Sequence, residues 1–258
     1  MYRSRGGFMS QIPTVTKNLI IINILIWLVE IIFPKFGENG IIRHLGLHYV
    51  SSSEFNPAQL LTYMFVHDQR SIMHIFFNMF TLYFFGPMLE RVWGAKRFFA
   101  FYMICGIGAA LVQEGVWALT WENEYLKALA VQNGVSVDVM RQEVERLISS
   151  GDQSILHYID QFQSVSMLTV GASGAIFGLL LGFAFVFPNV PLYLFFIPIP
   201  IKAKYMVLGY GVIEFFLGVT HSMNTVAHFA HLGGMLFGLI ILLYWRQKGQ
   251  LHGNRYNF

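Results

Sequence analysis

The chain has 258 residues, of which 55% are hydrophobic and only 12% are charged, and its mean hydropathy is +0.53. This composition excludes an ordinary water-soluble globular domain and indicates an integral membrane protein. A net charge of +3 is too small to suggest nucleic-acid binding, and the single cysteine, Cys105, excludes an internal disulfide or a cysteine-based metal cluster.

Six apolar segments are long enough to cross a bilayer, which requires roughly 20 apolar residues, or about 17 at the short end. Because a chain in lipid must satisfy its own backbone hydrogen bonds, each segment is predicted to be a helix. No small-residue cleavage site follows the first segment, so we expect it to be retained as an uncleaved span. The predicted spans are residues 18–34, 71–89, 97–117, 171–188, 204–220 and 226–245.

The basic residues predict how these spans are oriented. Lys and Arg concentrate in the cytoplasmic loops of membrane proteins. Of the 17 Lys and Arg residues, 11 fall on one side of the predicted bundle, which places both termini in the cytoplasm. We expect the membrane to be a bacterial inner membrane. These 11 residues are Arg3, Arg5, Lys17, Arg91, Lys96, Arg97, Lys202, Lys204, Arg246, Lys248 and Arg255.

Two connections between spans are long. Residues 35–70 form a first external loop that we expect to be partly embedded in the membrane interface. Residues 118–169 are polar and are predicted to form an external helical insertion between the third and fourth spans, broken at Asn133-Gly134. We expect this insertion to be a solvated cap without chemistry of its own. Its predicted apolar face consists of Val139, Met140, Glu143, Val144, Leu147 and Ile148.

Polar residues stand near the outer ends of three spans. With the N-terminus inside, the second, fourth and sixth spans all run from outside to inside. Ser173, His231 and His74 then lie at similar depth, and Asn78 lies one helical turn below His74. Polar groups at this depth are costly unless they face protein or water, so the pattern predicts a cavity open to the outside.

These residue types suit hydrolysis by an activated serine. Ser173 is the expected nucleophile and His231 the base that removes its proton. The side chains of His74 and Asn78, together with the backbone N–H of Ser173 at a helix N-terminus, are expected to donate hydrogen bonds to the oxyanion. Since no Asp or Glu lies near His231 in sequence, we predict a Ser–His dyad.

Glycines at intervals of four support a close contact between two of these spans. Small residues at this spacing let membrane helices approach closely, which would bring Ser173 to His231. These glycines are Gly174, Gly178 and Gly182 in the fourth span, and Gly234 and Gly238 in the sixth.

Taken together, the motifs resemble those of the rhomboid family of intramembrane serine proteases, over nearly the whole chain. The matching features are six spans, a long first external loop, H-x-x-x-N from His74 to Asn78, G-x-S-G from Gly171 to Gly174, and H-x-x-G-x-x-x-G from His231 to Gly238. The resemblance implies an all-α, polytopic six-helix bundle in a single domain over residues 1–258. It further implies a Ser173–His231 dyad that cleaves transmembrane substrates near their outer ends, with access controlled by the fifth helix and the capping loop, and without a metal or cofactor.

The sequence departs from the family pattern in a few places. Phe177 stands where some members carry a tyrosine that stacks on the catalytic histidine, so the stacking is expected to survive without the hydroxyl. The first loop lacks a Trp-Arg pair seen in many members, and the insertion is longer than in a minimal six-helix member. Glu90 resembles the family's structural glutamate at the inner end of the second helix, although an ordinary helix-end charge explains it equally well.

Other readings remain open at this point. A non-catalytic rhomboid-like binding or quality-control protein is the main alternative, but such a protein would be expected to lack the serine or histidine. A transporter would place its ion ligands near the midplane. A metal site at His228 and His231 is conceivable, but the sequence shows no converging carboxylate. His67 is expected to shape the cavity, and Glu214 to serve either a proton pathway or a hydrogen-bonded structural role.

Overall fold

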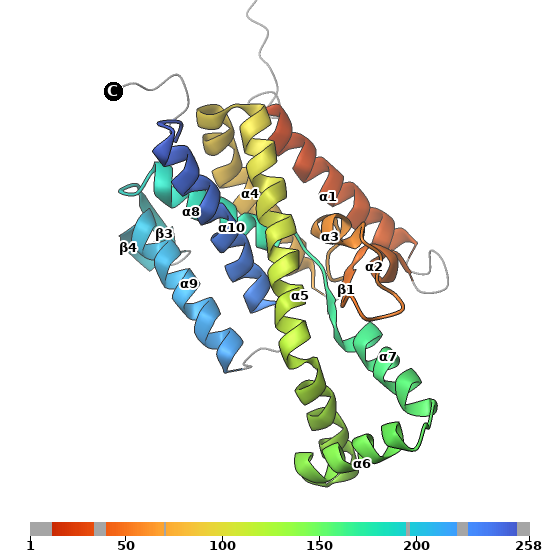
Figure 1. Ribbon diagram of the computed structural model, residues 1–258. Helices are drawn as coiled ribbons and strands as arrows, with labels where there is room; N and C mark the ends of the chain where they lie inside the picture. Colours follow the sequence, from red (N-terminus) through yellow and green to blue (C-terminus); the bar gives the residue numbers. More distant parts are fainter. Residues whose placement is uncertain (1–11, 34–39, 70, 195–196, 221–226, 252–258) are drawn as a thin grey trace, which may run out of the picture.

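The protein is described by a computed structural model, which covers residues 12–33, 40–69, 71–194, 197–220 and 227–251. Figure 1 shows long helices lying side by side in one bundle, with a helical projection at one end. The helices are α1 (Thr14–Ile32), α2 (Gly40–Leu45), α3 (Gln59–Thr62), the 3₁₀ turn η2 (Tyr63–Phe65), α4 (Ile72–Trp93), α5 (Ala95–Asn133), α6 (Val137–Ser149), α7 (Ser154–Ser166), α8 (Ser173–Val186), α9 (Ala203–Val219) and α10 (His228–Gln247). Two short antiparallel pairs accompany them, β1 (Leu47–His48) with β2 (Leu168–Thr169), and β3 (Pro191–Leu194) with β4 (Ile197–Lys202).

The helical membrane class is confirmed, but a count of six spans is not established. Within the described ranges, four helices are long and apolar enough to cross a membrane, namely α1, α4, α5 and α10. The segments predicted at residues 171–188 and 204–220 form the shorter helices α8, with 14 residues, and α9, with 17. α8 is shorter than predicted because a turn at Gly171 precedes it and Pro188 follows its end closely.

α8 forms the centre of the bundle. It packs against α4, α5 and α10, and ten of its 14 residues are buried. Its sequence is apolar on every side, as expected for a helix that is surrounded by other helices. Because α8 begins at Ser173, this central position fixes the place of the predicted nucleophile.

Glu90, near the end of α4, holds the start of α1. Its carboxylate accepts hydrogen bonds from the backbone N–H groups of Val15 and Thr16, at 2.9 and 2.7 Å, and from the Thr16 hydroxyl at 2.7 Å. The first N–H groups of a helix have no partner within it, and the helix dipole favours a negative charge there. Glu90 therefore caps α1 from a neighbouring helix, which is a structural role.

Several of the described basic residues gather at one end of the bundle, whereas Lys127, Arg141 and Arg146 lie in the insertion. Lys17 lies at the start of α1, Arg91 at the end of α4, Lys96 at the start of α5 and Arg246 at the end of α10. Arg3, Arg5 and Arg255, which also contributed to the predicted orientation, lie outside the described residues.

The insertion begins as an extension of α5. This helix has 39 residues and continues well beyond the other helices to Asn133 (Figure 1). The predicted break is confirmed, because Gly134 adopts a left-handed conformation with φ of 65° and ends the helix. α6 and α7 then return toward the bundle, and the three segments share a small apolar core around Tyr125, Leu126, Val144 and Ile155.

The apolar face predicted for α6 is only partly right. Val144 is buried, and Met140 and Leu147 pack against the small core, but Val139 and Ile148 are 53% and 51% exposed. The reason is that α6 packs mainly against α5 and α7, which cover a narrow stripe of its surface. The outer two residues of the predicted face therefore point away from the core.

The insertion is joined to the first external loop by hydrogen bonds. The β1–β2 pair links the two segments, and the backbone N–H and hydroxyl of Ser53 both donate to the Asp160 carboxylate at 2.7 Å. These bonds lower the pKa of Asp160. The hydroxyl groups of Ser52 and Ser164 lie 2.7 Å apart. On the bundle side of the insertion, the N–H of Val50 donates to Glu114 of α5 at 2.9 Å, so α5 and α7 together position this loop.

α9 is a peripheral helix. It lies at the edge of the bundle, next to the β3–β4 hairpin and on the side away from α1 (Figure 1). It packs against α8 and α10, and only Ala203, Val207 and Gly218 are buried among its described residues. α9 is therefore held to the rest of the bundle through a small part of its surface.

Candidate active site

The turn before α8 places Ser173. Gly171 has φ of 120°, a backbone conformation that side chains rarely allow, and its N–H donates to the carbonyl of Tyr63 at 2.9 Å. The Tyr63 hydroxyl in turn donates to the carbonyl of Gly106 in α5 at 2.7 Å. The turn is thus fastened to η2 and, through Tyr63, to α5, and Ser173 follows it as the first residue of α8.

Ser173 and His231 are in hydrogen-bond contact. The Ser173 Oγ lies 2.8 Å from Nε2 of His231, although 58 positions separate the two residues in sequence. The Phe177 ring stacks on the His231 imidazole with ring centroids 4.3 Å apart and planes 6° apart. His231 is only 8% exposed. This arrangement fixes the imidazole plane and aims Nε2 at the serine hydroxyl.

Glycines bring α8 and α10 together at this point. A Cβ atom added at Gly234 would lie 1.8 Å from the carbonyl oxygen of Gly174. A Cβ at Gly178 would lie 2.8 Å from the carbonyl oxygen of Gly234, and one at Gly238 would lie 3.4 Å from the Gly178 Cα. At Gly234 and Gly178 the two backbones therefore touch and leave no room for a side chain, whereas the contact at Gly238 is an ordinary van der Waals distance.

His74 borders the same space as Ser173. A Cβ atom added at Gly171 would lie 2.7 Å from Nε2 of His74 and 3.8 Å from the Oγ of Ser173. The Asp68 N–H points to Nδ1 of His74 at 3.3 Å, so in a neutral ring the proton is assigned to Nε2. His74 can therefore donate a hydrogen bond from Nε2 into the space beside Ser173.

Asn78 lies one turn further along α4. One N–H of its side-chain amide donates to the carbonyl of His74 at 2.8 Å, and the residue is 5% exposed. The second N–H of that amide is the donor that an oxyanion would require. His67 lies on the other side of His74, with ring centroids 5.2 Å apart in an edge-to-face arrangement. Burial lowers the pKa of His67 to about 3, with a further contribution from His74, so this ring adds no charge to the site.

Glu214 is the residue that the sequence analysis did not connect to the site. Its Oε2 atom lies 2.7 Å from Nδ1 of His228 and 3.0 Å from Nδ1 of His231. The expectation that no carboxylate approaches His231 is therefore wrong, because α9 packs beside α10 and brings Glu214 to a histidine 17 positions later in the chain. The available signal was a carboxylic acid in the middle of an apolar span.

The same three residues are the described group that could hold a divalent cation. The ligand atoms of Glu214, His228 and His231 lie within 4.8 Å of one another. Two imidazoles and one carboxylate are a common set of zinc ligands. A cation bound at Nδ1 of His231 would take the position that an N–H proton otherwise occupies.

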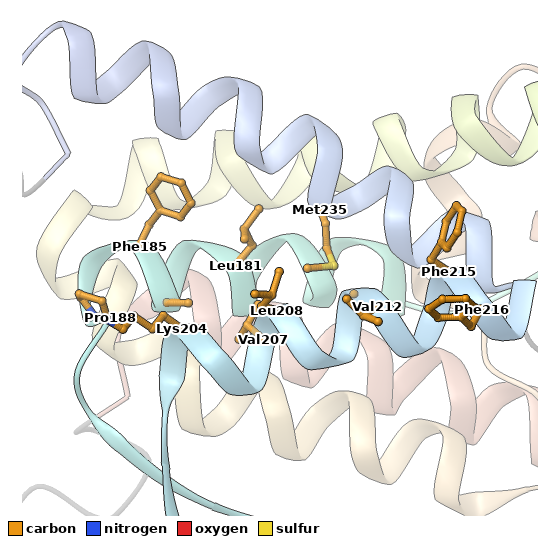
Figure 2. Close-up of a pocket in the computed structure, with 12 residues that line it drawn as sticks. Leu181, Phe185, Pro188, Lys204, Val207, Leu208, Val212, Phe215, Phe216 and Met235 are labelled. Carbon is orange, nitrogen blue, oxygen red and sulfur yellow. The ribbon is translucent and has the colours of Figure 1, made fainter.

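Two cavities adjoin this region. A cavity of about 610 Å³ lies between α8, α9 and α10, and Figure 2 shows its lining, which is apolar apart from Lys204. It reaches Met235, one turn after His231, and Phe215, the neighbour of Glu214. A second cavity, of about 340 Å³, lies further out and is lined by α5, α7 and the start of α10, including Glu124 and His228.

Comparison with known proteins identifies the family. The family model described as the rhomboid domain matches residues 54–124 and 147–248. Residues 125–146, which form the far end of the insertion, lie outside the match. No curated protein matches this chain. Rhomboid proteins are generally intramembrane proteases that act on transmembrane substrates within the bilayer. Because the family model covers more than half of the chain, this integral membrane protein belongs to the rhomboid family.

Proposed function

We propose that this protein is an intramembrane serine protease that cleaves transmembrane proteins near the outer face of the membrane. Ser173 is the nucleophile and His231 is its base. The observation that carries the proposal is the 2.8 Å contact between Ser173 Oγ and His231 Nε2, at the ends of two tightly packed helices in a rhomboid-family chain. A transport function has no comparable support, because these polar groups gather at the helix ends instead of at a broken helix.

The reaction divides into two steps through Ser173. The hydroxyl gives its proton to Nε2 of His231 while Oγ bonds to the carbonyl carbon of the scissile peptide. The carbonyl electron pair moves to the oxygen and returns as the C–N bond breaks, and Nε2 gives its proton to the leaving amine. A water molecule then attacks the resulting ester, its proton passes to His231, and Ser173 leaves with that proton. The steps require no metal or cofactor.

The negative oxygen of the intermediate requires donors that are already in place. The backbone N–H of Ser173 is at the first position of α8, where it has no partner within the helix. The Nε2–H of His74 and the second amide N–H of Asn78 complete the proposed oxyanion hole. Removing one such donor from a known serine protease costs about 3–4 kcal/mol of transition-state stabilisation.

The position of the apolar cavity favours lateral access for a substrate helix. It opens between the peripheral helix α9 and the central pair α8 and α10, and it extends toward the level of His231. We further propose that the basic end of the bundle faces the cytoplasm, as the distribution of Lys and Arg favours. Ser173 would then lie near the outer face, and a bacterial inner membrane is the location that we propose.

The test is labelling by a fluorophosphonate, which reacts with activated serines. Wild-type protein in detergent and in lipid should be labelled, whereas Ser173→Ala and His231→Ala should not be. Ser149→Ala, at an exposed serine of α6, is the matched control and should be labelled like the wild type. Well-folded wild-type protein that resists labelling in both environments would instead favour a non-catalytic rhomboid-like binding protein.

A further inference from the structure

Glu214 lies between two histidines in the wall of the proposed active site. Its side chain is 13% exposed, and those of His228 and His231 are 7% and 10% exposed. α9 supplies the carboxylate and α10 supplies both imidazoles, which are three residues apart and therefore share a helix face. A carboxylate within an apolar span is costly unless it is paired, so its position requires an explanation.

The protonation of His231 provides that explanation. Since Nε2 must accept the Ser173 proton, a neutral His231 carries its own proton on Nδ1. The Nδ1 atom is buried, and a buried N–H group without an acceptor is destabilising. The Oε2 atom of Glu214 is 3.0 Å away. The Nδ1–H bond of His231 is not well aligned with this oxygen, although the distance is short. Catalytic hydrogen bonds are often poorly aligned before a substrate binds.

We propose that Glu214 is the positioning residue for His231, so that the site works as a Ser173–His231–Glu214 triad instead of a dyad. The proposal rests on the proteolytic function proposed above. Glu214 keeps the His231 proton on Nδ1 and stabilises the imidazolium that forms when Ser173 loses its proton. The same division of roles between serine, histidine and a carboxylate occurs on several unrelated folds.

His228 has a separate part in this arrangement. Its Nδ1 atom is 2.7 Å from the same carboxylate oxygen, the shorter of the two contacts. It therefore helps to hold the carboxylate in place beside His231. Loss of the His228 imidazole should weaken the effect of Glu214 without removing it.

The decisive variant is Glu214→Gln, which keeps the size of the side chain and removes the charge. We expect kcat for a transmembrane test substrate to fall by about 10²–10⁴-fold with little change in KM, since an amide can leave His231 in the wrong tautomer. Glu214→Asp retains the carboxylate and should recover at least about tenfold of that loss. Glu114→Gln, another half-buried glutamate on a helix, is the matched control and should stay near wild-type activity.

Labelling with a fluorophosphonate separates this role from a structural one. The small probe reacts with Ser173 without a substrate helix passing α9, so its labelling rate should fall in Glu214→Gln together with kcat. A folded Glu214→Gln variant with wild-type kcat would overturn the proposal. Slow cleavage with unchanged labelling would also overturn it, because Glu214 would then act on substrate access.

Two further measurements keep the test decisive. If Glu214→Gln does not fold, as judged by its thermal melting and gel filtration, Glu214→Ala, which also removes the carboxylate, and His228→Ala take its place. Each should reduce kcat and labelling together, and wild-type values in both would refute the triad. Cleavage by Ser173→Ala would instead refute the proposed serine protease function. This outcome is distinct from a failure of the triad alone.

Discussion

Gly234→Ala should separate Ser173 from His231 without touching either side chain. The added Cβ atom would lie 1.8 Å from the carbonyl oxygen of Gly174, whereas real Cβ atoms are essentially never closer than 3.0 Å to such a neighbour. α10 must therefore move from α8 by at least about 1.2 Å at this point. The obstacle is backbone, so no rotation of a side chain relieves it.

This displacement is large on the scale of the catalytic contact. Adding it to the 2.8 Å between Ser173 Oγ and His231 Nε2 breaks the hydrogen bond, because such bonds weaken beyond about 3.2 Å. A misplacement of about 1 Å can reduce a rate about 10²-fold, which corresponds to about 2.7 kcal/mol of activation free energy. We therefore expect kcat/KM for a transmembrane test substrate to fall at least about 100-fold.

Gly238→Ala is the control on the same helix. Its Cβ atom would meet Cys105 Sγ and Phe101 Cζ at 3.3 Å, which small side-chain movements can absorb. Its activity should stay within about threefold of the wild type. Thermal melting in detergent must show that both variants fold. A folded Gly234→Ala protein with wild-type kcat/KM would refute the link between glycine packing and catalytic geometry.

Three further predictions follow from other contacts. Gly171→Ala should abolish cleavage, measured with the same substrate, because its Cβ would lie 2.7 Å from Nε2 of His74 and its φ of 120° strains any side chain. Glu90→Ala should lower the free energy of unfolding, followed by thermal melting in detergent, by at least about 2 kcal/mol, because one buried and one partly buried N–H group at the start of α1 lose a charged acceptor. The hydrogen bonds from Ser53 lower the pKa of Asp160, so they stabilise the folded insertion at neutral pH. This stabilisation is lost as the pH falls below the ordinary aspartate value of about 3.9 and through the folded-state pKa. Limited proteolysis of the insertion should therefore accelerate over that pH range, and Asp160→Asn should be cleaved faster than the wild type already at pH 7.

Apolar patterning and turn chemistry were sufficient to predict the helical membrane class and several helix boundaries. The apolar runs correspond to α1, α4, α5 and α10 because a chain in lipid has few alternatives to a helix. The break at Asn133-Gly134 was predictable because glycine adopts the left-handed conformation that ends a helix. The positions of Ser173 and His231 at helix N-termini followed from the directions of the spans.

Other features depend on tertiary contacts that have no local signal. The polar stretch after residue 117 continues α5, because α6 and α7 pack against its apolar side. The β3–β4 hairpin and the pairing of β1 with β2 join segments whose strands are too short for a clear alternation. Glu214 reaches His231 only because α9 lies against α10, and the separation of 17 residues in sequence conceals that contact.

The length of α5 places a condition on what can reach the active site. At 1.5 Å per residue its 39 residues span about 58 Å, whereas the hydrocarbon core is about 30 Å thick. On the order of 25 Å of helix therefore extends beyond the hydrocarbon core, beside the second cavity, which His228 helps to line. A bulky folded domain joined directly to a substrate helix would collide with this projecting part of α5. We therefore expect that, if the proposed proteolysis occurs, substrates with about eight or more extended residues between the folded domain and the substrate helix are cleaved faster than substrates with a shorter linker.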